Sequence, residues 1–304
     1  MIANGFKKYY YIHNKKIFIC EVMNVREINV SLIETTIEKM CIDANYYLNK
    51  DIKDALVKSS LVEASPLGKS ILNDILENAK LAEEKNVPMC QDTGMAVIFI
   101  TIGQEVHFVG GNLTDAINNG VRMGYSKGYL RKSVVKDPLN RVNTNDNTPA
   151  IIHYDIAPGD KVKITLAPKG FGSENMSKTK MLVPSDGING VEDFIVETVS
   201  LAGSNPCPPI IVGVGIGGTL EKAAILAKKA LILDIDKTNP DEYYREMETR
   251  LLKKINNLGI GPQGLGGNTT ALAVKILTYP THIAGLPVAV NINCHAARHI
   301  EIEL

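Results

Sequence analysis

A short turn between a helix and a strand is the feature that most constrains this chain. Residues 88–94 read Pro-Met-Cys-Gln-Asp-Thr-Gly, so a thiol, a carboxamide, a carboxylate and a hydroxyl stand on consecutive positions. The apolar spacing upstream predicts an amphipathic helix that ends near Asn86, and residues 95–102 form an apolar run typical of a buried strand. A turn held between two packed elements is rigid, and a rigid turn can aim reactive side chains. Free cysteine is commonly a small buried hydrophobe, so this turn alone leaves a structural and a functional role for Cys90 equally open.

The composition is that of an ordinary soluble globular protein. The 304 residues are 45% hydrophobic and 22% charged, enough for one large domain or two small ones. Lys+Arg and Asp+Glu both count 33, so no excess of positive charge indicates a nucleic acid or membrane partner. No apolar run reaches the ~18–20 residues of a membrane helix, and the N-terminus lacks the apolar segment of a signal peptide. We therefore expect a cytoplasmic protein whose five cysteines are reduced.

The chain is expected to consist of an extension, residues 1–22, and one main unit, residues 23–304. Met23 begins a stretch that reads as a second translation start, so we assign no function to what precedes it, Cys20 included. Helical patterns dominate the first part of the main unit, about residues 23–87, which we interpret as a framework rather than a site.

The first helix of this framework is predicted from a capping box at Ser31 and Glu34. Cys41 borders its apolar stripe, so core packing is favoured over a ligand role for this thiol. A short helix around residues 54–60 follows. The stripe of the first helix is Ile33, Ile37, Met40, Ala44 and Leu48.

Strands and helices alternate in the rest of the chain. Two hairpins are predicted, one around Gly103-Gln104 and one around Pro158-Gly159. Because hairpins are antiparallel, the expected fold class is α/β, with a helical N-terminal portion followed by mixed, partly antiparallel sheets flanked by helices. We expect hairpin strands at residues 97–102, 105–109, 151–156 and 161–167, further strands at 209–214 and 286–292, and helices at 114–123, 192–201, 220–229, 240–258 and 269–277.

Two polar loops are candidates for binding. Residues 128–149 form a loop of ~20 residues with Arg131 and Arg141, and loops of this length inside compact domains are usually functional. Guanidinium groups bind carboxylates in a bidentate way, so a small dicarboxylate would suit this loop, although solvated surface arginines are an equal alternative. Residues 169–175 combine glycines with Lys169, a weaker signal for an anion.

A glycine pattern at residues 213–218 supports a different function. It satisfies G-x-G-x-x-G after a predicted strand and before a helix, and a predicted strand at residues 231–233 ends at Asp234. This is the layout of a dinucleotide-binding unit, so an NAD(P)-dependent oxidoreductase is an alternative. Against it, residues 259–267 form another glycine loop in place of a further plain strand and helix repeat.

Three cysteines share a context that the other two lack. Cys90, Cys207 and Cys294 each stand at the edge of a strand or turn, beside amides, acids, histidines or prolines. Pro206 and Pro208 stiffen the backbone around Cys207, which excludes a helix interior. Their spacing is too long for a local zinc or ferredoxin motif, but thiolates from distant loops can meet in a fold. Soft thiolate ligands suit an iron–sulfur cluster with one iron free of protein ligands, and such an iron is a Lewis acid.

A structural zinc is the competing interpretation of these cysteines. Its fourth ligand would be His282, His295 or His299, and the chain would then be a scaffold subunit rather than an enzyme. Metal content separates the interpretations, because iron with sulfide favours the iron–sulfur cluster, zinc favours the scaffold, and nucleotide binding without iron favours the dehydrogenase.

The motifs of the chain, taken in order, resemble the α subunit of class I (iron–sulfur) fumarate hydratase and of its relative L(+)-tartrate dehydratase. The resemblance covers about residues 25–304 and implies a [4Fe-4S] cluster on Cys90, Cys207 and Cys294. It also implies substrate contacts at Gln91, Asp92, Arg131, Gly172 and His282. The motifs are residues 88–94, 128–131, 143–146, 169–175, 205–209, 261–267 and 293–299.

The resemblance implies reversible hydration of fumarate to L-malate, with L(+)-tartrate as the alternative substrate. Asp92 is the candidate in the acid–base path, and Arg131 with His282 would hold the carboxylates. Related enzymes have a second, smaller part that completes the site. The last motif lies five residues from the end of the chain, so we expect a separate β subunit, together with association between α subunits and no nucleic acid or membrane partner.

Overall fold

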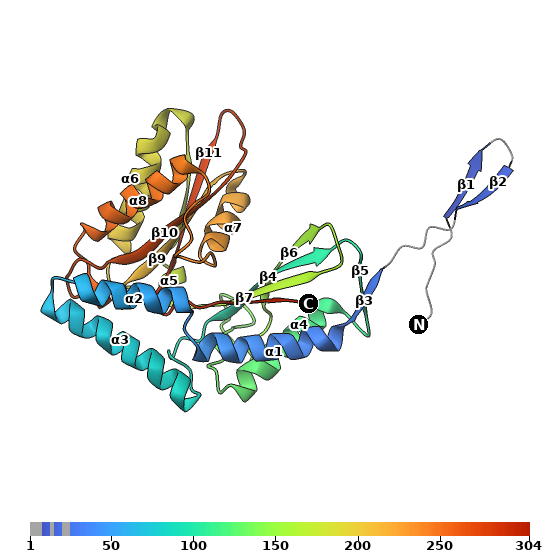
Figure 1. Ribbon diagram of the computed structural model, residues 1–304, viewed down its shortest axis with the longest axis horizontal. Coiled ribbons are helices and arrows are strands. Elements are labelled where there is room, and N and C mark those ends of the chain that lie inside the picture. Colours follow the sequence, from blue (N-terminus) through green and yellow to red (C-terminus); the bar gives the residue numbers. More distant parts are fainter. Residues whose placement is uncertain (1–7, 13–14, 20–24) are drawn as a thin grey trace.

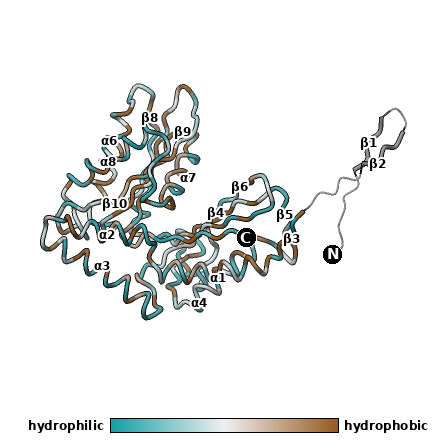
Figure 2. Tube along the Cα trace, in the orientation of Figure 1, coloured by the Kyte–Doolittle hydropathy of each residue, from teal (hydrophilic) through white to brown (hydrophobic). Residues whose placement is uncertain are grey.

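The computed structural model describes residues 8–12, 15–19 and 25–304. Cys20 lies outside these residues. Strands β1 (Lys8–Ile12) and β2 (Lys15–Ile19) pair as an antiparallel hairpin. The rest is built around two four-stranded sheets with separate hydrophobic cores, and helices of the N-terminal part run beneath both (Figure 1). Figure 2 shows that hydrophobic segments run through the strands of both sheets.

We call the first unit the β9 lobe. Its sheet has the order β10-β9-β11-β8, in which β9 is parallel to β10 and antiparallel to β11. Helices α6 and α8 pack on one face, and α7 packs on the other. The elements are β8 (Lys178–Leu182), α6 (Gly187–Ala202), β9 (Ile210–Gly217), α7 (Leu220–Ala230), α8 (Glu242–Asn256), β10 (Ala271–Tyr279) and β11 (Leu286–Asn293).

The glycines of β9 serve the packing of α7. Side chains alternate along a strand, so Val212 and Val214 enter the core beneath α6 and α8 while Gly213 and Gly215 face α7. A Cβ atom on Gly215 would stand 2.0 Å from the carbonyl oxygen of Ala223, so only glycine lets the helix lie this close. Most of the glycine pattern at residues 213–218 therefore belongs to the buried strand β9, which ends at Gly217.

Two predictions in this lobe are wrong. Residues 231–233 form a turn instead of a strand, so the expected strand, helix and strand repeat of a dinucleotide-binding unit does not form. Residues 269–277, predicted as a helix, lie mostly in strand β10. The apolar run of β10 is buried between β9 and α8, and burial on both sides gives no periodicity that separates a strand from a helix.

We call the second unit the β4 lobe. Its sheet has the order β12-β7-β4-β6, and one face is covered by α1 and α4. Residues of β4 and β6 on the other face line a cavity of about 350 Å³ that residues of α7 close from the β9 lobe. The elements are α1 (Val30–Tyr46), β4 (Met95–Gly103), α4 (Leu113–Lys127), β6 (Ile151–Ala157), β7 (Val162–Lys169) and β12 (Ile300–Glu303), with β3 (Arg26–Asn29) and β5 (Val106–Val109) paired beside them.

Both predicted hairpins are wrong in their pairing, although their strands form. Strand β5 pairs in parallel with β3 rather than with β4. Strand β4 lies between β6 and β7, so those two strands do not touch each other. The short connections led us to predict that strands adjacent in sequence are also adjacent in the sheet. Instead, the apolar β4 is buried between β6 and β7, and this sets the strand order. The predicted fold class is confirmed, since the sheets are mixed and flanked by helices.

The helical N-terminal part agrees with the sequence, except that α1 ends at Tyr46, before Leu48, and begins at a different cap. The stripe residues from Ile33 to Ala44 are buried, and Cys41 is fully buried among them. The cap of α1 is Asn29, not Ser31, and the cap of α4 is Asn112. Helices α2 (Lys50–Val62) and α3 (Pro66–Lys85) follow, and α3 ends at a left-handed Asn86. Among the described helices, none is both long enough and apolar enough to cross a membrane.

Candidate functional site

Two of the three cysteines meet at one end of the β9 sheet. Cys294 directly follows β11, whose last residue, Asn293, pairs with Ile211 near the start of β9, and Cys207 precedes that start. The backbone N–H of His295 donates to the carbonyl of Cys207 at 3.3 Å, and its ring Nδ1 lies 3.0 Å from the same oxygen. Antiparallel pairing of β9 and β11 thus joins the two cysteine loops.

Cys207 is held in a backbone conformation that costs free energy. Its φ is +54°, in the left-handed region that residues other than glycine rarely adopt, at a cost of ~1–3 kcal/mol. Its N–H donates to Ser204 at 3.0 Å, and both the N–H and the amide of Gln263 donate to the carbonyl of Pro208 at 2.8 Å. These contacts fix the loop and leave Cys207 exposed between the buried Pro206 and Pro208.

The third cysteine arrives from the helical part of the chain. The turn before Cys90 is held by the N–H of Met89, which donates to Asn45 at 3.0 Å, and by the amide of Asn78, which donates to Met89 at 2.8 Å. Cys90 and Cys294 pack against the same small apolar cluster. The ends of α1 and α3 therefore present Cys90 to the loops of the β9 lobe.

The three cysteines line one cavity of about 80 Å³, where ~10–15 Å³ suffices for a water molecule. Burial raises the pKa of the Cys207 thiol, and the neighbouring Cys294 and Cys90 raise it further, as expected for groups that share a site. The other lining residues are Asp92, Pro168, Gly170, Gly172, Ser173, Asn205, Pro206, Asn293, His295, Ala296 and Arg298.

The arrangement does not suit a single metal ion. Within the part of the chain that the structure describes, no three His, Cys, Asp or Glu side chains converge closely enough to hold one. A tetrahedral zinc needs such convergence, and the ring of His295 is already engaged with Cys207 and Gln263. Three thiols around one cavity suit a metal group with soft thiolate ligands.

The charge around the cavity also fits a thiolate-ligated group. Arg298 is 4% exposed, lines the cavity, and has a buried Nε without a hydrogen-bond partner in the described chain. Burial raises the pKa of the Cys294 thiol, and the guanidinium of Arg298 opposes that rise. A donor set of three thiols beside a buried, incompletely satisfied cation fits a cluster whose ligands become negative.

Asp92 lies at the cavity in a fixed orientation. Its Oδ2 accepts the N–H of Phe171 at 2.8 Å, and its Oδ1 accepts the N–H of Gly94 at 3.1 Å. A carboxylate has about four acceptor positions, so two remain for other donors. A Cβ atom on Gly170 would stand 3.0 Å from Oδ2, which shows how closely the loop after β7 encloses this side chain.

Two other predicted substrate residues, Gln91 and Arg131, belong to the turn of Cys90 and Asp92 and to the loop that is bonded to it. Gln91 is exposed and next to both Cys90 and Asp92. The hydroxyl of Thr93 donates to the carbonyl of Arg131 at 3.0 Å, which holds the long polar loop against the turn and leaves the Arg131 side chain exposed. Gly172 lines the cavity itself. The structure thus brings Asp92 and Gly172 into the cysteine cavity, places Gln91 in the same turn as Asp92, and ties the backbone of Arg131 to that turn.

His282 is not brought to the cavity. It lies in the exposed turn between β10 and β11, whereas Cys294 follows the other end of β11. Eight strand residues at ~3.3 Å each separate the two ends by roughly 26 Å. His282 therefore cannot contact a ligand held by the cysteines of its own chain.

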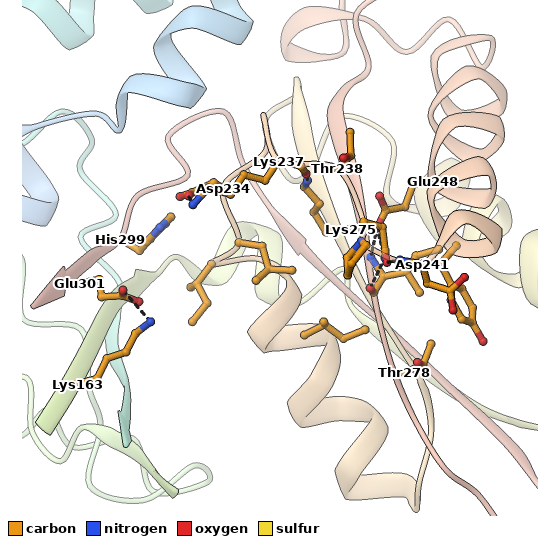
Figure 3. Close-up of a pocket in the computed structure, with 17 residues that line it drawn as sticks. Lys163, Asp234, Lys237, Thr238, Asp241, Glu248, Lys275, Thr278, His299 and Glu301 are labelled. Carbon is orange, nitrogen blue, oxygen red and sulfur yellow. Dashed lines mark hydrogen bonds and ion pairs between the residues drawn. The ribbon is translucent and has the colours of Figure 1, made fainter. Parts of the chain in front are cut away.

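A larger cavity lies elsewhere. It measures about 600 Å³ and contains no cysteine. Figure 3 shows Lys163 and Glu301 of the β4 lobe at one end and Lys275, Glu248 and Asp241 at the other. Its acids are already engaged, for example Glu248 with the N–H of Ile276 at 2.8 Å, so size alone does not make this cavity the functional site.

Gln263 and Arg298 had no assigned function in the sequence analysis, and Lys169 was named there only as part of a weak signal for an anion. Lys169 is 4% exposed, and its Nζ donates to Ile292 at 2.8 Å and Ser173 at 2.9 Å. Burial lowers its pKa to about 8. Gln263 and Arg298 join the loops of the cavity. The position of Arg298, four residues after Cys294, was a signal in the sequence, whereas nothing local indicated Gln263.

The chain is similar to known proteins over most of its length. A family model described as Fumarate hydratase (Fumerase) matches residues 34–303. A Methanocaldococcus jannaschii protein provisionally named L(+)-tartrate dehydratase subunit alpha is 45% identical over 262 residues, which is 84% of this chain and 92% of the relative. The L(+)-tartrate dehydratase subunit alpha of Escherichia coli strain UTI89 is 36% identical, and that of Shigella sonnei is 35% identical, each over 252 residues and 82% of both chains.

Proposed function

The chain belongs to the fumarate hydratase (Fumerase) family, and from this premise we propose that it is the α subunit of a two-subunit hydro-lyase that interconverts fumarate and L-malate. The single observation that carries the proposal is the cavity shared by Cys90, Cys207, Cys294 and Asp92. It combines soft metal ligands with a fixed carboxylate, which is what a metal-assisted addition of water needs.

Cys90, Cys207 and Cys294 would hold a [4Fe-4S] cluster. When bound, the cluster supplies a Lewis acid at the iron that no cysteine ligates, which makes a hydroxyl a better leaving group. The strained backbone of Cys207 and the contacts of His295 and Gln263 keep the thiols in place before the cluster arrives, so little ordering is needed on binding.

Asp92 is the residue for proton movement in this proposal. Its two hydrogen bonds from Phe171 and Gly94 fix its direction, and its remaining acceptor positions are available at the cavity. A proton acceptor must lie within hydrogen-bond reach of the proton it takes, and such groups contribute ~10²–10⁴-fold to rate. Asp92 is the carboxylate that lines the cysteine cavity.

The carboxylates of the substrate would be held by Arg131, with Gln91 and the backbone at Gly172 as further contacts. Arg131 is exposed and its loop is tied to Thr93, so its guanidinium can reach a dicarboxylate without a charged partner to displace. A role for His282 requires a second copy of the chain, because its own cysteines are too far away.

A smaller β subunit would complete the site. The relatives are named as alpha subunits, and the Cys207 side of the cavity is exposed in this chain. Charged groups act more strongly when water is excluded, so a cover over this opening would raise the effect of both the cluster and Asp92.

The proposal is tested by comparing the cluster-loaded chain alone with an equimolar mixture of the chain and its β partner. The loss of fumarate absorbance is followed in both samples. We expect poor hydration by the chain alone and a large gain with the partner. Equal rates would contradict the half-site proposal, and no activity on fumarate in either sample would contradict the substrate.

L(+)-tartrate is the second candidate substrate. The observation in its favour is that the relatives compared above carry the name L(+)-tartrate dehydratase subunit alpha. Both substrates are small dicarboxylates that present a hydroxyl for elimination. A panel of fumarate, L-malate and L(+)-tartrate on the two-subunit enzyme identifies the better one by its kcat/KM.

A further inference from the structure

Arg298 is a buried cation that the described chain does not neutralise. It lies between β11 and β12 and is 4% exposed. Its Nη2 donates to the carbonyl of Asp92 at 2.6 Å and its Nη1 to the carbonyl of Ala296 at 3.4 Å, while Nε has no partner. No carboxylate of the described residues forms an ion pair with it.

Other cations of the chain are treated differently. Lys169 is equally buried, but Glu174 lies 3.2 Å from its Nζ. Arg250 is half-exposed and pairs with Glu192 at 3.0 Å. A buried charge without a partner costs several kcal/mol, so a stable site must supply a negative group from outside the chain or from groups that ionise there.

Among the described residues at the cavity, the three thiols are the groups that gain negative charge when a metal binds. Asp92 also lines the cavity, but its two carboxylate oxygens accept the N–H groups of Gly94 and Phe171, and its contact with the guanidinium is through its backbone carbonyl. The three cysteines are neutral as thiols and become negative when they ligate metal. Arg298 and Cys294 line the same cavity and stand four residues apart in the chain.

We propose that Arg298 is the fixed counter-charge of the cluster. Its two Nη groups, the fork of the guanidinium, also hold the Cys90–Asp92 turn against the Cys294–Ala296 turn. This inference rests on the proposed cluster and assigns a positioning residue to it. The negative charge of the ligated thiolates then compensates the buried guanidinium, and the guanidinium in turn stabilises the more negative, reduced form of the cluster.

The first test replaces Arg298 by Met, which keeps most of the volume and removes the charge. We expect the reconstituted Arg298→Met chain to release iron to a chelator at least tenfold faster than the wild type. In the cluster-free variant, loss of the two hydrogen bonds of Arg298 lowers stability and removal of the uncompensated buried charge raises it, so the unfolding temperature should stay close to that of the wild type. Arg250→Met is the matched control and should change neither property of the site.

The second test separates the charge from the fork through the reduction potential. Arg298→Lys keeps the charge and loses the planar donor geometry. We expect its cluster to have a potential near that of the wild type, with iron release between those of the wild type and Arg298→Met. The potential of Arg298→Met should be lower, since removal of a nearby positive charge favours the oxidised form.

The outcomes distinguish this inference from the proposed function. Wild-type iron release and potential in Arg298→Met would overturn the counter-charge role while leaving the cluster in place. A lower unfolding temperature of the cluster-free variant with an unchanged potential would make Arg298 a purely structural residue and would also overturn it. A wild-type chain that binds no iron would overturn both proposals.

Discussion

The two lobes use their sheets differently. In the β9 lobe, helices cover both faces of the sheet, and β9 is buried along its whole length. In the β4 lobe, α1 and α4 cover one face, and the other face looks across a cavity to α7 of the β9 lobe. Strand β6, at the edge of that sheet, is mostly exposed or half-buried. The β9 lobe is thus closed on itself, whereas the β4 lobe depends on its neighbour.

The difference shows how the candidate site is assembled. The closed β9 lobe contributes Cys207 and Cys294 from loops at the ends of paired strands. The other side contributes Cys90 from a helix end, with Asp92 bonded to the loop after β7. The site therefore lies at the seam between the lobes. We expect changes at the seam to affect cofactor, catalysis and stability in decreasing order.

The largest effect should come from removing a cysteine on either side of the seam. If both sides are needed, Cys90→Ser should abolish full cluster loading as completely as Cys207→Ser or Cys294→Ser. The wild type should bind about four irons and four sulfides per chain after anaerobic reconstitution. Cys41→Ser, in the core of α1, is the control and should load normally. Full loading of Cys207→Ser would exclude Cys207 from the cofactor site.

The second prediction separates catalysis by Asp92 from binding of the cofactor. Asp92→Asn keeps the size of the side chain and loses the carboxylate, so turnover should fall by ~10²–10⁴ with normal iron content. Steady-state kinetics and iron analysis on the same sample check this. Gly170→Ala should cause a smaller loss, because its Cβ would press on Oδ2 of Asp92. Near-normal turnover of Asp92→Asn with an intact cluster would exclude a catalytic role.

A third experiment breaks the linkage of the lobes. Glu174 follows β7 and pairs with Lys169 and with Lys228 of α7, and it accepts the amide of Asn291 of β11 at 2.8 Å. Glu174→Gln should lower the free energy of unfolding of the cluster-free chain by about 1–3 kcal/mol, measured by urea denaturation. Glu246→Gln, on the exposed side of α8, is the control. An unchanged free energy would mean that this contact does not join the lobes.

The same contact predicts an acid dependence. Burial raises the pKa of Glu174, but the positive charges of Lys169 and Lys228 lower it by more, so that the pKa falls to about 2. A carboxyl whose pKa is lower in the folded chain stabilises the fold above its unfolded value, ~4.3, and this contribution disappears as pH falls toward 2. The stability of the wild type should therefore decrease over that range, and the decrease should be smaller in Glu174→Gln. Parallel pH profiles for both proteins would contradict the assignment.

The smallest effect should come from the exposed rim of the seam. Arg131→Lys keeps the charge but loses the bidentate fork, so KM for the dicarboxylate should rise about tenfold with little change in kcat. Arg141→Lys in the same loop is the matched control, because Arg141 only donates to its neighbour Pro138. Equal KM values for the two variants would place substrate binding outside this loop.

The sequence by itself determined the local elements of this protein. The stripe of α1, the end of α3 at Asn86, the apolar β4 and the strand after Pro209 follow from spacing, capping and β-forming residues within a few positions. The context of three cysteines also singled out the residues that line one cavity. These features are readable because each depends on neighbours in the chain.

Only the tertiary structure decided which strands pair and how the loops meet. The sequence of β10 was predicted as a helix because a strand buried on both sides shows no hydrophobic periodicity. Strand β5 pairs with β3 rather than with β4, which precedes it in the sequence. Arg298 meets Asp92, 206 residues earlier, because the lobes dock, and no local pattern specifies such a contact. Pairing and docking depend on the fit of surfaces that are distant in sequence, so their outcome is set by the burial of the whole chain.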